Sequence, residues 1–162
     1  MRSHLFNGTL MKLLLLLPCL IAPLSMAQDH ISDRPNFTGV WRLNIDKSVV
    51  EEGIQSMIVK IDHNDPVIKM EIEGVRRGQA LKSSVMYIID GKERPLGQRN
   101  ARHTSKWEGR TLVTRIVYPD DDVVTINRNT LSEDGKTRIL DTEQTSEKKY
   151  RGRKTRYVFE KQ

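Results

Sequence analysis

Hydrophobic and polar residues alternate at period two along most of the chain, beginning near Phe37. In the first run, Phe37, Trp41 and Leu43 share one face. Because successive side chains of a strand point to opposite faces, this pattern is typical of strands with one buried face. The alternation returns at 57–61, 68–73, 85–89, 101–108, 112–118, 124–131, 137–144 and 155–161. The pattern predicts an all-β chain of about eight to ten antiparallel strands.

Turn signals at short spacing separate these segments. Asp90-Gly91 predicts a tight hairpin, because glycine tolerates the positive φ that such turns require. Residues 64–66, Gly109 and 133–136 mark further turns. The sequence therefore indicates neighbouring strands joined directly to one another.

Helix has little room in this pattern. The segment from Lys47 to Gly53 fits one short helical stretch, with Asp46 as its N-cap. Strands that each carry one apolar face must bury that face and protect their edges. A single antiparallel up-and-down barrel does both, although two packed sheets are a second solution that alternation alone does not exclude.

Residues at the N-terminus have the features of a secretory signal peptide. Arg2 and Lys12 form a basic region, an apolar run follows, and Ser25-Met26-Ala27 places small residues before a cleavage site. The apolar run is shorter than the roughly 20 residues of a membrane span. We therefore expect cleavage after Ala27 and a secreted or periplasmic protein without a membrane span. The expected segments are a signal peptide at 1–27, a flexible lead-in at 28–35 and a β-barrel domain at 36–162.

Removal of the signal peptide changes the chemistry of the mature chain. The signal peptide starts at either Met1 or Met11, and it contains Cys19, the single cysteine of the chain. The mature domain therefore has no disulfide and no thiol for metal binding or catalysis. Loss of Arg2 and Lys12 lowers the formal net charge from +6 to +4. This charge favours weak contact with an anionic envelope surface and does not indicate a nucleic-acid partner.

Several short motifs resemble those of the calycin group, which includes the lipocalins and fatty-acid-binding proteins. The segment 36–43 resembles the Gly-x-Trp entry of that group, and 106–113, 131–137 and 156–161 are similar in kind. Together they resemble a family of small secreted bacterial proteins with a lipocalin-like barrel. The resemblance implies a lumen that holds a small apolar or amphipathic molecule.

Two features depart from the fatty-acid-binding proteins that the chain resembles. Those proteins carry a helix pair between their first two strands, where this chain has only a short segment. They also end in Arg-x-Tyr-Glu-Lys, whose arginine and tyrosine hold a carboxylate. Aligning Glu160-Lys161 with that ending puts Phe159 at the tyrosine position and Tyr157 at the arginine position, and Arg156 points outward. The resemblance does not extend to that carboxylate-binding device.

Aromatic and polar side chains on the expected inner faces are candidate ligand contacts. Tryptophan and tyrosine pair an apolar body with a polar tip, which suits an amphipathic ligand, although core packing explains the same positions. Burial would favour the neutral ring of His103. Arg128 shares its parity with Val124 and Ile126, which makes it a candidate inward cation for an anionic head group. The candidate ligand-binding residues are Trp41, Tyr87, His103, Trp107, Tyr118, Arg128, Tyr157 and Phe159.

The sequence carries no recognisable catalytic or metal-binding motif. It has no Gly-x-Ser-x-Gly elbow, no His-Glu-x-x-His pair and no phosphate-binding glycine loop. His103 beside an inward acid, Asp141 or Glu143, is the one pairing that would support proton transfer. We expect a protein that is not an enzyme and that uses neither a cofactor nor a metal.

Two functions therefore remain for a barrel that is expected to be monomeric. The first is a binding protein that holds its ligand in the lumen. The second is a solid barrel that contacts an envelope component or a protein through its basic surface. Ligand pockets usually measure about 300–1,000 Å³, so a smaller lumen would favour the second function. The basic surface is a cluster of Lys148, Lys149, Arg151, Arg153, Lys154 and Arg156.

Overall fold

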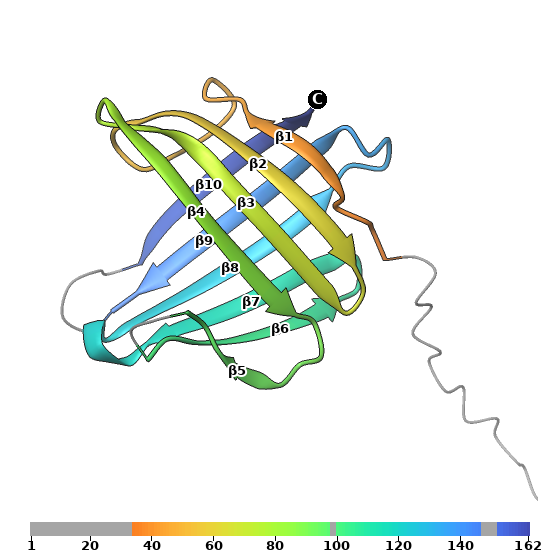
Figure 1. Ribbon diagram of the computed structural model, residues 1–162, viewed down its shortest axis with the longest axis vertical. Helices are drawn as coiled ribbons and strands as arrows, with labels where there is room; N and C mark the ends of the chain where they lie inside the picture. Colours follow the sequence, from red (N-terminus) through yellow and green to blue (C-terminus); the bar gives the residue numbers. More distant parts are fainter. Residues whose placement is uncertain (1–33, 98–99, 147–151) are drawn as a thin grey trace, which may run out of the picture.

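Ten antiparallel strands form one continuous, curled sheet in the computed structural model of the chain (Figure 1). The structure describes residues 34–97, 100–146 and 152–162. The expected signal peptide at 1–27 lies outside these ranges, as do most of the lead-in at 28–35 and the basic residues Lys148, Lys149 and Arg151. Within the described ranges, no helix has the length and apolar character that crossing a membrane requires.

Strands that are neighbours in the sheet are also consecutive in the sequence, except that β1 lies beside β10. The spatial order is β4-β3-β2-β1-β10-β9-β8-β7-β6-β5. The prediction of an all-β, lipocalin-like antiparallel barrel is confirmed, since one curled sheet is present rather than two packed ones. In Figure 1, β1 to β4 cross in front of β7 to β10, so that the two halves of the sheet face each other. The strands are β1 (Gly39–Leu43), β2 (Ile54–Asn64), β3 (Val67–Arg76), β4 (Gln79–Ile88), β5 (Glu93–Pro95), β6 (Arg102–Glu108), β7 (Thr111–Tyr118), β8 (Val123–Leu131), β9 (Thr137–Thr145) and β10 (Arg153–Lys161). A short 3-10 helix, η2 (Pro119–Asp121), joins β7 to β8.

The interior between the two halves is filled from the faces that alternation predicted for β1, β2, β6 and β7. Trp41 and Phe159 are essentially inaccessible to solvent, as are Ser105, Leu112 and Thr114. Their neighbours in sequence point outward, because a strand turns successive side chains to opposite faces. The buried face of each strand therefore contributes to one shared core.

The barrel is not closed by hydrogen bonds between β4 and the strand that follows it. β5 is short and pairs with β6, whereas β4 pairs with β3. The prediction of a hairpin at Asp90-Gly91 is therefore wrong. This loop instead carries the chain from β4 across to β6, where Gly91 N–H donates to the carbonyl of Ser105 over 2.9 Å.

The segment between β1 and β2 is a loop, so the prediction of a helix from Lys47 to Gly53 is also wrong. Val49 forms an isolated antiparallel bridge to Arg156 of β10. The Ser48 hydroxyl donates to the Asn44 carbonyl and accepts from the backbone N–H of Val158. The contacts with Val158 and Arg156 of β10 take the place of the hydrogen bonds that a helix would have made within the segment.

Stacked aromatic rings fill one end of the barrel. The rings of Phe37, His63 and Trp107 form a cluster in which the centroids of each pair lie 5.8 to 6.0 Å apart. Trp41 donates its indole N–H to the Phe37 carbonyl over 2.8 Å. His63 Nδ1 accepts from the Phe37 backbone N–H, and Nε2 lies 3.0 Å from an Asp65 carboxylate oxygen. This end of the lumen is therefore packed, and free space lies further along the barrel.

Candidate ligand-binding site

A cavity of about 120 Å³ lies in the lumen between two walls of different chemistry. The strands β2, β3 and β4 contribute an apolar wall made of Met57, Val59, Met70, Ile72 and Val85. The strands β7, β8 and β9, which face them in the barrel, contribute the polar side chains Thr114, Asn127, Asn129 and Arg138. The lining is completed by Tyr87, Leu140 and Phe159. This division suits a molecule with one apolar side and one polar side.

The cavity is smaller than a usual pocket for a drug-sized ligand, which measures about 300–1,000 Å³. Without rearrangement it has room for only a small molecule or part of a larger one. Met57 and Met70 are only partly buried, and methionine is the apolar side chain that adapts its shape most readily. Movement of these two side chains is the simplest way to enlarge the space.

A chain of buried hydrogen bonds connects His103 to the polar wall. His103 Nδ1 lies 3.2 Å from the Ser105 hydroxyl, which lies 3.0 Å from the hydroxyl of Thr114. Burial, together with the positive charge of Arg94, lowers the pKa of His103 below its ordinary value. The ring is therefore neutral at pH 7. It contacts the Ser105 hydroxyl, which in turn contacts the hydroxyl of Thr114, a residue that lines the cavity.

Tyr87 is the polar-tipped residue of the apolar half. It is buried on β4, and burial raises the pKa of its phenol, with a smaller contribution from nearby Tyr118. The phenol therefore keeps its proton at any physiological pH. It offers the cavity a neutral hydroxyl rather than a charge.

Arg138 is the charged residue of the lining, and the sequence reasoning did not select it. It is 2% exposed, and burial lowers the pKa of its guanidinium to about 9. The group therefore still carries its positive charge at neutral pH. A signal was present in the sequence, because Arg138 shares its parity with the apolar Leu140, which also lines the cavity.

The structure places the sequence-predicted residues in three different settings. Tyr87 and Phe159 line the cavity, and His103 reaches it through Ser105 and Thr114. Trp41 and Trp107 belong to the packed end of the barrel. Tyr118 and Tyr157 are partly buried against the core without lining this cavity.

The prediction of an inward Arg128 is wrong. Arg128 is exposed, whereas its neighbours Asn127 and Asn129 line the cavity. The half-buried Val124 and Ile126 share the outer face of β8 with Arg128, whereas Thr125, Asn127 and Asn129 have the inward parity. Alternation was therefore present, but the apolar pair Val124 and Ile126 marked the outer face.

The acids that sequence reasoning placed beside His103 face away from it. The Asp141 carboxylate forms a two-point ion pair with Arg156 on the outside of the sheet, with bonds of 2.7 and 2.9 Å. The Glu143 carboxylate Oε1 lies 3.5 Å from Lys154 Nζ. No acid of β9 therefore forms a proton-transfer pair with His103. Among the described residues, no group of three or more His, Cys, Asp and Glu side chains is arranged to hold a metal ion.

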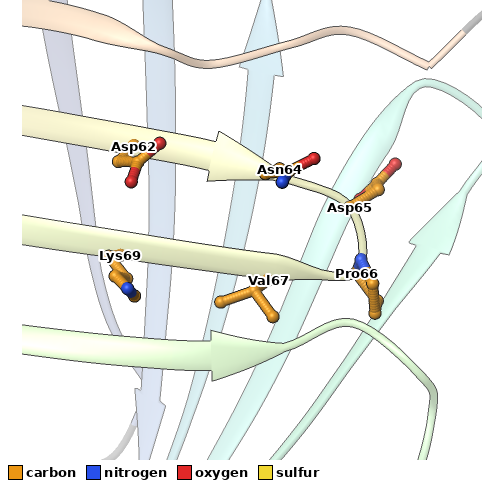
Figure 2. Close-up of a pocket in the computed structure, with 6 residues that line it drawn as sticks. All are labelled: Asp62, Asn64, Asp65, Pro66, Val67 and Lys69. Carbon is orange, nitrogen blue, oxygen red and sulfur yellow. The ribbon is translucent and has the colours of Figure 1, made fainter.

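A larger hollow of about 370 Å³ lies on the outer surface at the turn between β2 and β3 (Figure 2). Asp62, Asn64, Asp65, Pro66 and Lys69 are exposed there, and Val67 is partly buried. Figure 2 shows these side chains spread along two strands and their turn rather than converging on one point. The hollow is therefore an open, solvated surface, and the lumen cavity is the stronger candidate site.

Comparison with known proteins supports the fold. No protein-family model matches the chain, and no curated protein matches its sequence. Among solved structures, a mutant of the fluorescent protein UnaG has a TM-score of 0.57 at 12% identity, covering 78% of this chain and 96% of that one. The REP1-NXSQ fatty acid transporter has a TM-score of 0.53 at 11% identity, covering 77% and 95%. Secretory abundant heat soluble protein 4 from Ramazzottius varieornatus has a TM-score of 0.51 at 15% identity, covering 78% and 94%. These likenesses show the same kind of antiparallel β-barrel fold.

Proposed function

We propose that this protein is a binding protein that takes a small apolar or amphipathic molecule into the lumen of its barrel. The observation that carries the proposal is the division of the cavity into an apolar wall on β2 to β4 and a polar wall on β7 to β9. Thr114 and Asn127 each bond to a neighbouring side chain on this wall, and a solid core would be filled more favourably by apolar side chains than by these polar ones. The likeness to a protein described as a fatty acid transporter is consistent with this role.

Binding of a neutral apolar dye such as Nile red, followed by its fluorescence, tests the proposal directly. Met70→Trp places a large ring in the cavity and should abolish binding. Met86→Trp is the matched control, because Met86 is 52% exposed on β4 and should leave binding unchanged. Thermal melting of both variants checks that they fold. If Met70→Trp is folded and binds the dye as the unchanged protein does, the lumen is not the site.

The alternative function, a solid barrel that acts through its basic surface, has one observation in its favour and one against it. The small volume of the cavity favours it. The basic residues that the structure describes in that cluster are paired with acids, however: Arg153 with Glu51, Lys154 with Glu143 and Arg156 with Asp141. This pairing reduces the charge they offer to a partner. Salt-sensitive binding to anionic vesicles, with no dye binding in the lumen, would favour the alternative.

Export from the cell is a second part of the proposal, and it rests on the sequence of residues 1–27. The processed protein should begin at Gln28. Mass spectrometry of the N-terminal peptide, on protein from the medium and from each cell fraction, tests this. An intact N-terminus in a cytoplasmic fraction would contradict export.

A further inference from the structure

Arg138 is a buried cation whose nitrogens are not matched by acceptors in the described part of the chain. Its Nε and Nη1 atoms are both buried and have no hydrogen-bond partner there. The guanidinium lies over the ring of Phe159, with Cζ 4.3 Å from the ring centroid. The face of the ring attracts the charge but offers no lone pair to the N–H groups at the edge of the guanidinium.

The surroundings of Arg138 explain why these nitrogens find no acceptor. In register, Arg138 lies between Leu131 on β8 and Phe159 on β10, which are both apolar. The described lining of the cavity contains no carboxylate. The acids of its own strand lie on the outer face, where Asp141 is held by Arg156.

Buried charges in folded proteins are almost always paired, because removing an ion from water without a partner is very costly. Two unmatched guanidinium nitrogens on a side chain that lines a cavity therefore point to an acceptor supplied from outside the chain. Folding has already removed water from Arg138. An incoming anion would need to lose only its own hydration to gain the full interaction.

We propose that the ligand of this cavity is an amphipathic anion whose carboxylate pairs with Arg138. This inference rests on the proposed function and specifies the class of molecule that the lumen takes. The planar guanidinium presents N–H groups in a fork that matches the two oxygens of a carboxylate. Asn127 lies on the same wall, and because its amide oxygen accepts from Thr142 over 2.9 Å, its NH₂ group is the end that donates to the anion.

The remainder of the ligand lies against the opposite wall. Met57, Met70, Ile72 and Val85 offer only apolar contacts. A hydrocarbon chain placed there is removed from water while the carboxylate stays at Arg138. The cavity therefore selects a molecule with one anionic end and one apolar body, and not a free inorganic anion.

Calorimetric titration with octanoate, octanol, octylamine and acetate separates the contributions of charge and chain. The unchanged protein should bind octanoate about tenfold more tightly than octanol, and it should reject octylamine because of like charge. Acetate should bind far more weakly than octanoate, because it lacks the apolar body. Equal affinity for octanoate and octanol would overturn the role of Arg138, and equal affinity for acetate and octanoate would overturn the role of the apolar wall.

The variant Arg138→Met removes the charge and keeps a long apolar side chain. It should bind octanoate no better than octanol, whereas Arg138→Lys should keep part of the preference. Arg156→Met is the control, since Arg156 is an outward arginine on the next strand and its loss should leave the preference intact. A preference for octanoate that survives in folded Arg138→Met would overturn the inference.

The outcomes distinguish this inference from the proposed function. If octanol and Nile red bind in the lumen but octanoate has no advantage, the proposed function stands and the inference fails. If neither neutral molecule nor octanoate binds, both fail together. If Arg138→Met does not fold, Arg138→Gln supplies the same test, because it also removes the charge and keeps a polar side chain.

Discussion

The rings of Tyr87 and His103 meet across the seam at which the sheet has no hydrogen bonds, with centroids 5.0 Å apart and planes inclined by 59°. Tyr87 belongs to β4 and His103 to β6. Since β4 does not pair with the short β5, contacts between side chains take the place of a strand ladder here. The seam is therefore the part of the barrel that depends most on individual side chains.

We expect Tyr87→Ala to destabilise the protein by about 3 kcal/mol, because it removes a buried ring from this seam. Amide exchange in β4 should accelerate more than amide exchange in β8. Met86→Ala, at an exposed position on the same strand, should change stability by less than about 0.5 kcal/mol. Urea denaturation and hydrogen exchange measure the two effects. Similar losses in both variants would show that the seam is not held by Tyr87.

The lowered pKa of His103 makes stability depend on pH in a definite direction. The folded protein keeps the ring neutral, whereas the unfolded chain takes up a proton at the ordinary histidine pKa of about 6.5. The unfolded state therefore binds more protons as the pH falls through that value, and stability decreases by at most about 1.4 kcal/mol per pH unit for this one proton.

Urea denaturation at pH 7.5 and at pH 5.5 checks this expectation. The variant His103→Asn should lose most of the decrease between the two values, because it cannot take up the proton. His63 is present in both proteins and does not affect the comparison. An unchanged decrease in the variant would assign the effect to other groups.

Gly74 is required by a close approach between β3 and β2. A Cβ atom at this position would clash with the Ser56 carbonyl oxygen and lie 3.1 Å from the Met57 Cα atom. Both contacts are to backbone, next to a shift of register between Ile54 and Ser56. Gly74→Ala should therefore cost about 1–3 kcal/mol, because the strands must separate. Ser84→Ala on the exposed face of β4 is the control, and equal melting temperatures would contradict the account.

Replacement of Arg138 should stabilise the empty protein. A buried cation without an anionic partner carries an uncompensated loss of hydration, and even buried ion pairs can be replaced by apolar residues with a gain of about 1–4 kcal/mol. Arg138→Met should therefore melt at a higher temperature than the unchanged protein in the absence of ligand. Saturating octanoate should narrow the difference by stabilising only the unchanged protein. A lower melting temperature for ligand-free Arg138→Met would mean that Arg138 has a structural partner.

The strands and most inward faces could be predicted from the sequence, because alternation directly reports one buried face. The inner positions of β6 and β7, from His103 to Tyr118, follow the predicted parity. The same reasoning failed on β8, where the polar Asn127 and Asn129 line the cavity and the apolar Val124 and Ile126 face outward. Apolar residues mark the inward face reliably only where that face packs against other apolar side chains.

The wrong predictions of a hairpin and of a helix have a different cause, since both segments are fixed by contacts between residues distant in sequence. Asp90-Gly91 has the local chemistry of a hairpin, but Gly91 bonds to Ser105 on β6. The segment from Lys47 to Gly53 has a helical start and stop, but Val49 bonds to Arg156 of β10. Tertiary hydrogen bonds outweighed local preference in both cases.

The methionine methyl groups provide the most direct test of the lumen as the binding site. After residue 27 the chain contains Met57, Met70 and Met86. The first two line the cavity, and the third is exposed on the outside of β4. On titration of ¹³C-methyl-labelled protein with octanoate, the Met57 and Met70 signals should shift together and saturate, while Met86 stays in place. A shift confined to Met86, or no shift in any signal while calorimetry reports binding, would contradict binding inside the barrel.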